Sequence, residues 1–563
     1  MRNGKQKLEL TWIGKDEQPK LEPRILIEDP AKSYGDPKTV NMLIHGDNLL
    51  ALKALEQDFA GKIKCVYIDP PFNTGQAFDH YDDSKEHSIW LSLMRDRLDL
   101  LRKLLSEDGV LFVHLNMDEL AHFKVLADEI FGRSNFLQVI TIKSATTASF
   151  RSINFCPVTV TEYILMYSKN RNVYQRPMQY VATEYSEDYG HFIVNKDEPI
   201  EKWKLVSLDE LFYQANNLKG WQEAKQKWGE QWKHVRYSEK SKLAHSNPDK
   251  IVSLNTLQKP SQVILNVIEE SKKLKGKVFE VKRAGRESIY VFNGRTLAFF
   301  SSKIRQIDGE IQPSEVLTNM WEDISYLSLG LEGGVDFKNG KKPEKLIKRI
   351  LEIATDESDW VLDSFLGSGT TAAVAHKMNR KWIGVEFGEH CHTHCIPRLA
   401  RIIDGKDTGG ISEIVQWQSG GGFKFYELAP SLLRKDKHDN WVIDEKYNAD
   451  MLAAAMAKHE GFKYCPDQQI YWKQGQSTEK DFIFTTTNFV TAEMLDKIHE
   501  EMKPGESLLI CAKSFAPQSK ARHNNITIKK IPQAVLGKCE FGKDNYNLNI
   551  INPPKEEDFE AEE

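Results

Sequence analysis

The sequence contains no long run of apolar residues. Its apolar stretches are short and interrupted by charge, whereas a membrane-spanning helix needs about 20 apolar residues in succession. The opening residues, MRNGKQKLELTW, carry charge but no apolar core, so we expect no secretory signal. Seven cysteines, an odd number at irregular spacings, argue against a disulfide framework. We therefore expect a cytoplasmic protein with reduced thiols and no membrane partner.

The chain also lacks an excess of positive charge. Its 76 Lys and Arg residues against 81 Asp and Glu residues give a net charge of −5, which by itself argues against a nucleic-acid partner. The distribution argues the other way, because the segment from Lys202 to Arg305 has 21 basic against 10 acidic residues. Within it, the run KKLKGKVFEVKR (residues 272–283) is predicted to contact phosphate, although most such runs are only solvated surface. Local charge predicts a nucleic-acid partner.

A length of 563 residues predicts several domains. Residues 1–40 are Pro-rich and weakly periodic, which is typical of an irregular N-terminal extension. Apolar strands alternate with amphipathic helices over 41–170 and again over 319–408, and this predicts an α/β fold with a mostly parallel sheet covered on both faces. Residues 171–318 are irregular, basic and aromatic. Residues 409–563 indicate a mixed α+β domain with an acidic tail.

A glycine-rich turn, DSFLGSGTT, spans Asp363 to Thr371 between a predicted strand and a predicted helix. This geometry presents backbone N–H groups and the positive end of a helix to a ligand. About twenty residues later a strand ends at Glu386, where nucleotide-binding folds place an acid on ribose hydroxyls. The chain lacks the G-x-x-x-x-G-K-[ST] and G-x-G-x-x-G patterns, which argues against a P-loop or a nicotinamide dinucleotide site. Taken alone, the turn is equally typical of a simple connection.

A second motif, DPPF, follows the apolar strand CVYI. The Asp69 carboxylate and the carbonyl of Pro70 can accept both hydrogens of an exocyclic amine, and Phe72 can stack on a planar base. The prolines stiffen this loop. A similar NPPK at residues 552–555 lacks the aromatic residue and leads into the acidic tail, so we assign it no role. DPPF alone could be an ordinary loop.

The sequence CHTHC, Cys391 to Cys395, has the residue types of a metal site. No second cluster stands at the spacing of a zinc finger, and the two cysteines are four residues apart on a predicted helix. A packing pair is the favoured interpretation, and we predict no metal.

Both motifs on strands of one sheet are far more specific than either alone. The sequence resembles the β-class DNA amino-methyltransferases, and within them the Mod subunits of Type III restriction–modification systems. The resemblance lies in LIHGDNLLAL, VYIDPPFNTG, HSIWLSLMRDRLDLLRKLLSEDGVLFVHLN, EYILMYSKN and VLDSFLGSGTTAAVAHKMNRKWIGVE. It implies a circularly permuted, Rossmann-like S-adenosylmethionine-dependent methyltransferase domain. Residues 171–318 would be an inserted target-recognition domain, and 409–563 a C-terminal α+β domain.

The resemblance also implies roles for single residues. The catalytic motif that grips the target base would be Asp69, Pro70, Pro71 and Phe72, with Phe replacing the commoner Tyr. The residues implied to hold S-adenosylmethionine are Asp363, Phe365, Gly367, Ser368, Gly369 and Thr370, with Glu386 on the ribose. Asp47 would face the cofactor adenine, and Lys342 and Pro343 match the KP element that closes the cofactor pocket.

The resulting prediction is a site-specific methyltransferase that flips adenine out of duplex DNA and methylates its N6. Methylation of cytosine N4 is the main alternative, since the same pocket geometry serves any exocyclic amine. Asp rather than Ser at position 69 favours adenine in the family. A specificity subunit without activity and a nucleotide-dependent oxidoreductase are weaker alternatives, because neither explains DPPF. The resemblance further implies a homodimer and a restriction subunit on a separate chain.

Overall fold

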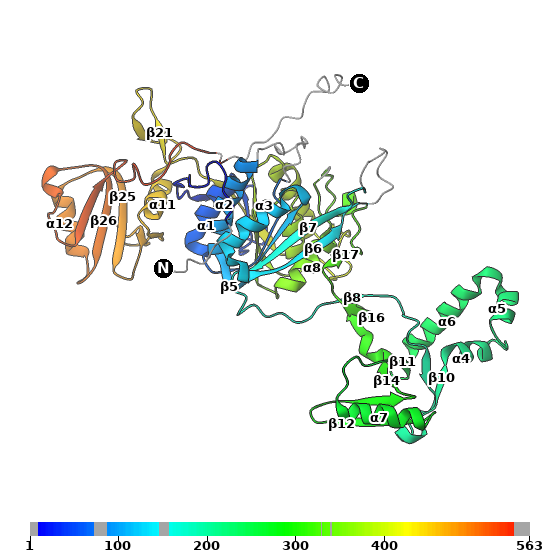
Figure 1. Cartoon of the computed structure of the whole chain (residues 1–563). Coiled ribbons are helices and arrows are strands. Elements are labelled where there is room, and N and C mark those ends of the chain that lie inside the picture. Colours follow the sequence, from blue (N-terminus) through cyan, green and yellow to red (C-terminus); the bar gives the residue numbers. More distant parts are fainter. Residues whose placement is uncertain are drawn as a thin grey trace, which may run out of the picture. The chain divides into compact units, whose positions relative to one another are not determined.

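The computed structural model describes residues 9–71, 87–145, 157–327, 329–337, 340–544 and 546. The chain divides into two compact units (Figure 1). Unit 1 contains Met1–Arg176 and Asn319–Glu563, and unit 2 contains Pro177–Thr318. Unit 2 is thus one continuous segment between the two segments of unit 1, whereas the composition of the sequence placed these limits at 171 and 318.

Unit 1 is built on a large mixed sheet whose strands follow the order β1-β20-β3-β19-β18-β4-β5-β7-β6-β17, with β2 paired to β20. The strands are β1 (Leu26–Glu28), β2 (Tyr34–Gly35), β3 (Met42–His45), β4 (Ile63–Ile68), β5 (Leu105–Leu115), β6 (Phe136–Lys143), β7 (Thr161–Ser168), β17 (Met320–Trp321), β18 (Trp360–Asp363), β19 (Lys381–Glu386) and β20 (Gly422–Leu428). Neighbouring strands from β20 to β5 are all parallel. The mostly parallel α/β sheet predicted from the sequence is therefore present.

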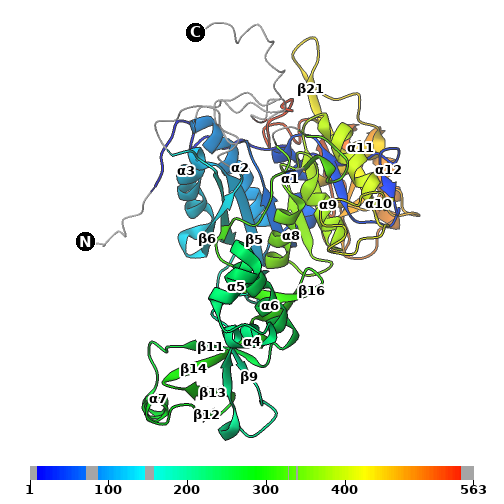
Figure 2. The ribbon, with the colours of Figure 1, turned by 90° about the vertical axis from the view of Figure 1, so that its right-hand side faces the viewer.

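Two sets of helices cover this sheet (Figures 1 and 2). The first set is α1 (Asn48–Phe59), α2 (His87–Leu104) and α3 (Met117–Ala127), and the second is α8 (Glu344–Ala354), α9 (Thr370–Lys377) and α10 (Ile396–Ile403). The β3–α1–β4 and β4–α2–β5 connections run along the sheet in one direction, and β18–α9–β19 runs in the other. Because such connections are right-handed, the two sets lie on opposite faces.

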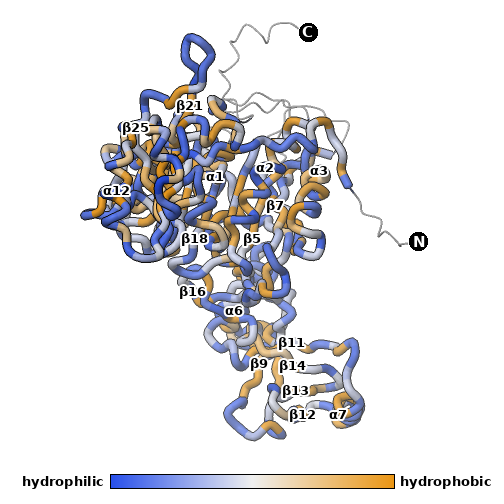
Figure 3. The backbone as a smooth tube through the Cα atoms, turned by 90° about the vertical axis from the view of Figure 1, so that its left-hand side faces the viewer, coloured by the Kyte–Doolittle hydropathy of each residue, from blue (hydrophilic) through white to orange (hydrophobic). Residues whose placement is uncertain are grey.

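The core of unit 1 explains why these segments form these elements. β5 reads GVLFVHL over its buried half, and every residue from Val110 to Leu115 is fully buried in the sheet. The tube coloured by hydropathy shows the central strands as largely apolar (Figure 3). α2 buries Trp90, Leu98 and Leu101 on one side, and its last turn carries Arg102 and Lys103, which stabilise the negative end of a helix.

Some pairings differ from what the sequence indicates. β7 is antiparallel to both β5 and β6. An almost continuous apolar run such as TEYILMYS has the same pattern in either direction, so the sequence does not fix its orientation. The sheet also extends beyond residue 409, where we placed the start of the C-terminal domain, because β20 pairs in parallel with β3. β1 and β2, inside the predicted irregular extension, pair with β20 as well.

Unit 2 holds a six-stranded sheet in the order β10-β9-β11-β14-β13-β12 and a three-stranded sheet in the order β15-β16-β8. Its strands are β8 (Tyr180–Ala182), β9 (His191–Ile193), β10 (Leu205–Ser207), β11 (Ile251–Asn255), β12 (Val278–Arg283), β13 (Arg286–Phe292), β14 (Arg295–Phe299), β15 (Ile304–Ile307) and β16 (Glu310–Val316). Its helices are α4 (Leu208–Ala215), α5 (Trp221–Trp228), α6 (Trp232–Ser246) and α7 (Gln262–Lys273).

The C-terminal part of unit 1 forms a second, smaller sheet, β23-β24-β25-β26-β27. Its strands are β23 (Lys463–Tyr464), β24 (Gly475–Gln476), β25 (Asp481–Val490), β26 (Ser507–Phe515) and β27 (Ile526–Lys530), and its helices are α11 (Ala449–His459) and α12 (Ala492–Glu501). The hairpin β21 (Leu433–Lys435) and β22 (Trp441–Ile443) precedes it. Among the described residues we find no helix with the length and apolar character needed to cross a membrane.

Candidate active site at the carboxyl edge of the sheet

Four neighbouring parallel strands, β3, β19, β18 and β4, bring both sequence motifs to one edge of the sheet. β4 runs directly into Asp69, β18 ends at Asp363 and β19 ends at Glu386. The register pairs Leu362 of β18 with Val66 of β4 and with Ile383 of β19, so these strands end side by side. The carboxyl edge of a parallel sheet is where ligands bind in open α/β folds.

Asp363, the last residue of β18, stabilises the glycine turn that follows this strand. One carboxylate oxygen accepts a hydrogen bond from the backbone N–H of Phe365 at 2.9 Å, and the other accepts one from the Thr371 hydroxyl at 2.6 Å. Asp363 is 2% exposed, and burial raises its pKa to about 7. Gly369, at φ +82°, is the N-cap of α9 and adopts a left-handed conformation that favours glycine. Asp363 therefore shapes the turn.

Glu386 holds the same turn from the next strand. Its Oε2 accepts a hydrogen bond from the backbone N–H of Gly367 at 2.6 Å, and its Oε1 accepts from Phe387 and Gly388 at 2.8 and 3.0 Å. His390 Nε2 lies 2.9 Å from Oε1. A Cβ added at Gly367 would meet no atom of the described residues within 4 Å, so the described part of the chain leaves space in front of this turn. The structure thus brings the predicted ribose acid onto the predicted cofactor turn.

Three further residues predicted to bind the cofactor, Ser368, Thr370 and Asp47, are also buried. Arg398 Nη1 donates to the Thr370 hydroxyl at 2.7 Å and to the backbone oxygen of Ser368 at 3.2 Å. Asp47 is the N-cap of α1, where its Oδ1 accepts from the backbone N–H groups of Leu49 and Leu50 at 2.9 and 3.1 Å. Its Oδ2 accepts from the backbone N–H of Tyr546 at 3.0 Å. Asp47 therefore has a structural role independent of any ligand.

In the catalytic motif, the two oxygens of the Asp69 carboxylate have different surroundings. Asp69 Oδ2 lies 3.4 Å from the ammonium nitrogen of Lys342. Asp69 Oδ1 is buried and has no hydrogen-bond partner within the described part of the chain. Pro70 is buried, and the carbonyl of Pro71 accepts a hydrogen bond from the indole of Trp90 at 2.8 Å, which fixes the loop. Phe72 lies outside the described residues.

Lys342, whose role toward the cofactor stays a prediction, contacts Asp69 of the catalytic motif. Two residues that the sequence did not single out, Glu162 and His114, lie next to it. Its ammonium group is 3.1 Å from Glu162 Oε2, and the same oxygen is 2.6 Å from His114 Nε2. The Tyr67 hydroxyl lies 2.9 Å from His114 Nδ1. His114 and Glu162 interrupt the apolar strands GVLFVHL and TEYILMY, and a polar residue in such a strand is a signal that could have revealed them.

The charged groups of this network shift one another's pKa values. Burial raises the pKa of Asp69, and the charges of Lys342 and His114 oppose part of that rise. Burial also works against the charge of Glu162, but Lys342 and His114 hold the pKa of Glu162 well below its usual range. Burial opposes the charge of Lys342, yet Asp69 and Glu162 keep the pKa of Lys342 above its usual value. The ammonium group of Lys342 therefore stabilises the charges of two carboxylates, those of Asp69 and Glu162.

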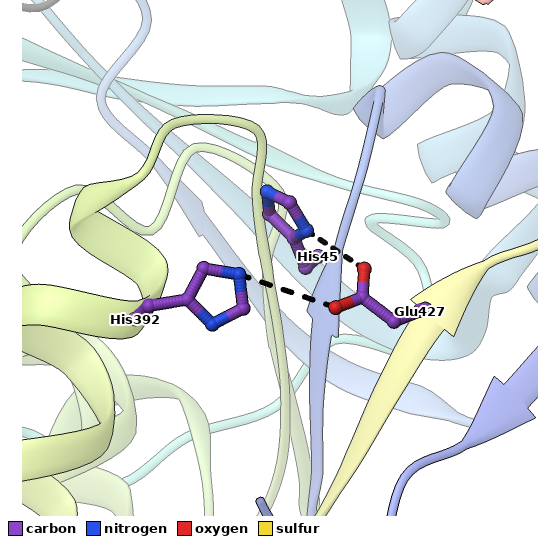
Figure 4. Close-up of side chains that lie close together, drawn as sticks. All are labelled: His45, His392 and Glu427. Carbon is purple, nitrogen blue, oxygen red and sulfur yellow. Dashed lines mark hydrogen bonds and ion pairs between the residues drawn. The ribbon is translucent and has the colours of Figure 1, made fainter.

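A second polar cluster lies at the ends of β3 and β20, where His45, His392 and Glu427 face one another (Figure 4). His45 Nδ1 is 2.7 Å and His392 Nε2 is 4.0 Å from the Glu427 carboxylate. Lys32 already pairs with the same carboxylate at 2.9 Å, so the cluster has a countercharge without an ion. Of the CHTHC motif, Cys391 and Cys395 are buried, as expected for packing residues. The absence of a metal stays a prediction.

A protein-family model described as DNA methylase, N6_N4_Mtase, matches residues 63–281 and 283–396, which is more than half of the chain. The chain belongs to this DNA methylase family. It is 37% identical over 420 residues to the probable Type III restriction-modification enzyme HindVI Mod subunit of Haemophilus influenzae, covering 69% of this chain and 54% of that protein. It thus spans about half the length of that relative.

The chain is also similar to other proteins. The Type II methyltransferase M.EcaI of Enterobacter cloacae is 26% identical, with 75% of this chain and 81% of that protein covered. The EcoPI Mod subunit of Escherichia phage P1 is 28% identical, with 67% and 62% covered. Among solved structures, the Thermus thermophilus protein TTHA0409, crystallised with S-adenosyl-L-methionine, matches at 14% identity and a TM-score of 0.32 over 69% of this chain and 99% of that one.

Proposed function

We propose that this chain transfers a methyl group from S-adenosylmethionine to N6 of adenine in duplex DNA, as the modification subunit of a Type III restriction–modification system. The observation that carries the proposal is the meeting of both motifs at one sheet edge, with Asp69 Oδ1 buried and unpartnered among the described residues. A buried oxygen without a donor is costly unless a ligand supplies one. Membership of the DNA methylase family and the Mod relatives support the proposal.

The residues at this edge fit S-adenosylmethionine. Among the described residues, no atom lies within 4 Å of a Cβ placed on Gly367, and the buried hydroxyl of Ser364 in the same turn has no partner. The acidic groups Asp69, Asp363 and Glu386 suit a ligand that carries positive charge on its sulfonium and ammonium groups. The cofactor supplies an electrophilic methyl group when bound. The turn over Asp363–Thr370 and Glu386 would hold it, and Lys342, which lies 3.4 Å from Asp69, would act beside the catalytic motif.

The catalytic motif aligns the substrate amine. Asp69 Oδ1 accepts one N–H of the adenine amine and the Pro70 carbonyl accepts the other, which directs the nitrogen lone pair toward the methyl group. The Trp90 hydrogen bond to Pro71 keeps this loop in place. Phe72 stacks on the base after it has been flipped out of the duplex, since the amine is not accessible within the stack.

DNA recognition falls to unit 2 in this proposal. The local excess of basic residues between Lys202 and Arg305 lies within it, and phosphate contacts provide most of the non-specific affinity for DNA. The relatives named as Mod subunits favour a separate restriction subunit as partner, and we expect a cytoplasmic homodimer.

Methylation of duplex DNA by the full chain with tritiated S-adenosylmethionine tests the proposal. We expect N6-methyladenine after hydrolysis. Finding N4-methylcytosine in its place would show that cytosine, the alternative, is the target base. Asp69→Ala should lower turnover by about 10²–10³-fold, the range for loss of one polar group aligned on a reacting centre. Phe72→Ala should cost about 1–3 kcal/mol of base stacking, and Phe72→Tyr should be nearly neutral.

The matched control is Asp118→Asn, an exposed aspartate near the end of the neighbouring strand β5. It should retain full activity, and calorimetry should show that Asp69→Ala still binds S-adenosylmethionine. A fully active Asp69→Ala enzyme would show that DPPF is only a loop and would refute the assignment.

A further inference from the structure

The catalytic aspartate is the end of a buried chain of polar groups. Lys342 Nζ lies 3.4 Å from Asp69 Oδ2 and 3.1 Å from Glu162 Oε2. These three side chains come from segments far apart in the sequence: the end of β4, the start of β7 and the residue two before α8. Their side chains keep only 18%, 20% and 11% of their surface exposed for Asp69, Glu162 and Lys342. Burying three charges together is costly unless their geometry is maintained.

The chain continues behind Glu162. His114 is fully buried, with Nε2 2.6 Å from Glu162 and Nδ1 2.9 Å from the Tyr67 hydroxyl. Burial raises the pKa of Tyr67 well above its usual value, so the hydroxyl beside Nδ1 keeps its proton. On the other side of the ring, Nε2 faces the Glu162 carboxylate. Glu162 is thereby fixed from one side by His114 and from the other by Lys342.

We propose that Lys342, held in place by Glu162, is a positioning residue that fixes the Asp69 carboxylate through Oδ2 and leaves Oδ1 for the adenine amine. The inference rests on the proposed methyl transfer, but it assigns a role to Lys342, Glu162 and His114 that the motifs do not. Lys342 stabilises the ionised, amine-accepting form of Asp69, because an ammonium group at this distance favours the charged carboxylate. Glu162 shares that ammonium and so moderates its effect on Asp69.

The competing explanation is purely structural: the ion cluster could simply hold β4, β7 and the start of α8 together. Only the positioning role predicts that removing Lys342 and removing the charge of Glu162 shift the pH profile of methylation in opposite directions. Without Lys342, Asp69 would remain buried beside Glu162, so its pKa should rise. Without the charge of Glu162, Lys342 would pair with Asp69 alone and a like charge would be gone, so the pKa of Asp69 should fall. Among the described residues, the titratable groups that act on Asp69 are Lys342, Glu162, His114, Tyr67, Tyr326 and Asp363.

The experiment is the pH dependence of single-turnover methylation of duplex DNA by the full chain, saturated with S-adenosylmethionine. Lys342→Met should move the acid limb of the profile to higher pH by roughly 1–3 units, the range for removing an opposite charge next to an aspartate. Glu162→Gln should move the same limb to lower pH. Lys342→Arg should restore a limb close to that of the wild type, since it keeps the positive charge.

Matched controls come from the same helix region. Lys348→Met and Glu352→Gln remove another ion pair, 2.7 Å apart on α8, and should leave the limb in place. Calorimetry with S-adenosylmethionine should give similar affinities for Lys342→Met and wild type. If Lys342→Met fails to fold, the proposal still requires that the acid limb of Glu162→Gln moves to lower pH.

Three results separate the possibilities. A wild-type chain that does not methylate DNA would refute the proposed function itself. A methylating wild type with both variants weakened at every pH and no opposite movement of the limbs would leave only the structural role and overturn this inference. Loss of S-adenosylmethionine affinity in Lys342→Met with an unmoved limb would assign Lys342 to the cofactor instead, which also overturns it.

Discussion

Replacement of Asp363 by Asn should make unit 1 more stable at neutral pH and leave its stability almost unchanged in acid. Asp363 is 2% exposed, and burial raises its pKa from 3.8 to about 7. Below about pH 4 the carboxyl is neutral in both the folded and the unfolded chain. Between pH 4 and 7 the unfolded chain loses this proton while the folded chain keeps it, so folding stability falls as pH rises. Above pH 7 the loss is complete.

The size of the effect follows from the same pKa. A tenfold change in proton affinity corresponds to about 1.4 kcal/mol, so the ionised, buried Asp363 costs the folded state up to about 4 kcal/mol. Asn keeps the shape and an acceptor oxygen for the Phe365 N–H, and its amide can donate to the Thr371 hydroxyl, which now donates to Asp363. The turn should therefore persist without the charge.

Denaturant unfolding of both proteins from pH 5 to pH 8.5 measures this difference. The free energy of unfolding of Asp363→Asn minus that of the wild type should increase across this range, and contributions shared by both proteins cancel. Asp188→Asn, an exposed aspartate in unit 2, serves as the control and should show no such trend. A difference that is constant with pH, or one that decreases, would refute the argument that burial dominates at Asp363.

Three further changes test other parts of the structure. Lys377→Met leaves the buried carboxylates of Glu344 and Asp407 without the ammonium group 2.7 and 2.6 Å away, and should destabilise unit 1 by about 3–5 kcal/mol in the same unfolding assay; a loss below about 1 kcal/mol would contradict the pairing. Gly369→Ala should cost about 1–2 kcal/mol of backbone strain at φ +82° and so lower the melting temperature. No steric cost should be added, because the new Cβ would meet its neighbours only at van der Waals distance. Replacing the four exposed lysines of residues 272–277 by Gln should weaken DNA binding and reduce the logarithmic salt slope by up to about 0.9 per lysine; an unchanged slope would remove this segment from the phosphate interface.

The sequence by itself predicted the chemistry of the site. The motifs DPPF and DSFLGSGTT can be interpreted without knowledge of the rest of the fold. A carboxylate in a proline-stiffened loop and a strand–glycine–helix turn have the same physical properties in many surroundings. Period and composition likewise predicted the parallel α/β sheet, since strands covered on both faces are almost entirely apolar. The structure describes strands and helices over these segments, including β4, β18 and α9.

Only the tertiary structure decided which distant residues meet. Glu162 and His114 are single polar residues in apolar strands, and no local pattern shows that they lie against Lys342, which is 180 residues beyond Glu162 along the chain. Their contact depends on β7 lying antiparallel beside β5, and an apolar strand has the same pattern in both directions. For Asp47 the predicted contact with the cofactor stays a prediction, and only the fold shows that both of its carboxylate oxygens have backbone partners. Local residue types thus determined what each group can do, and long-range strand pairing determined which groups act together.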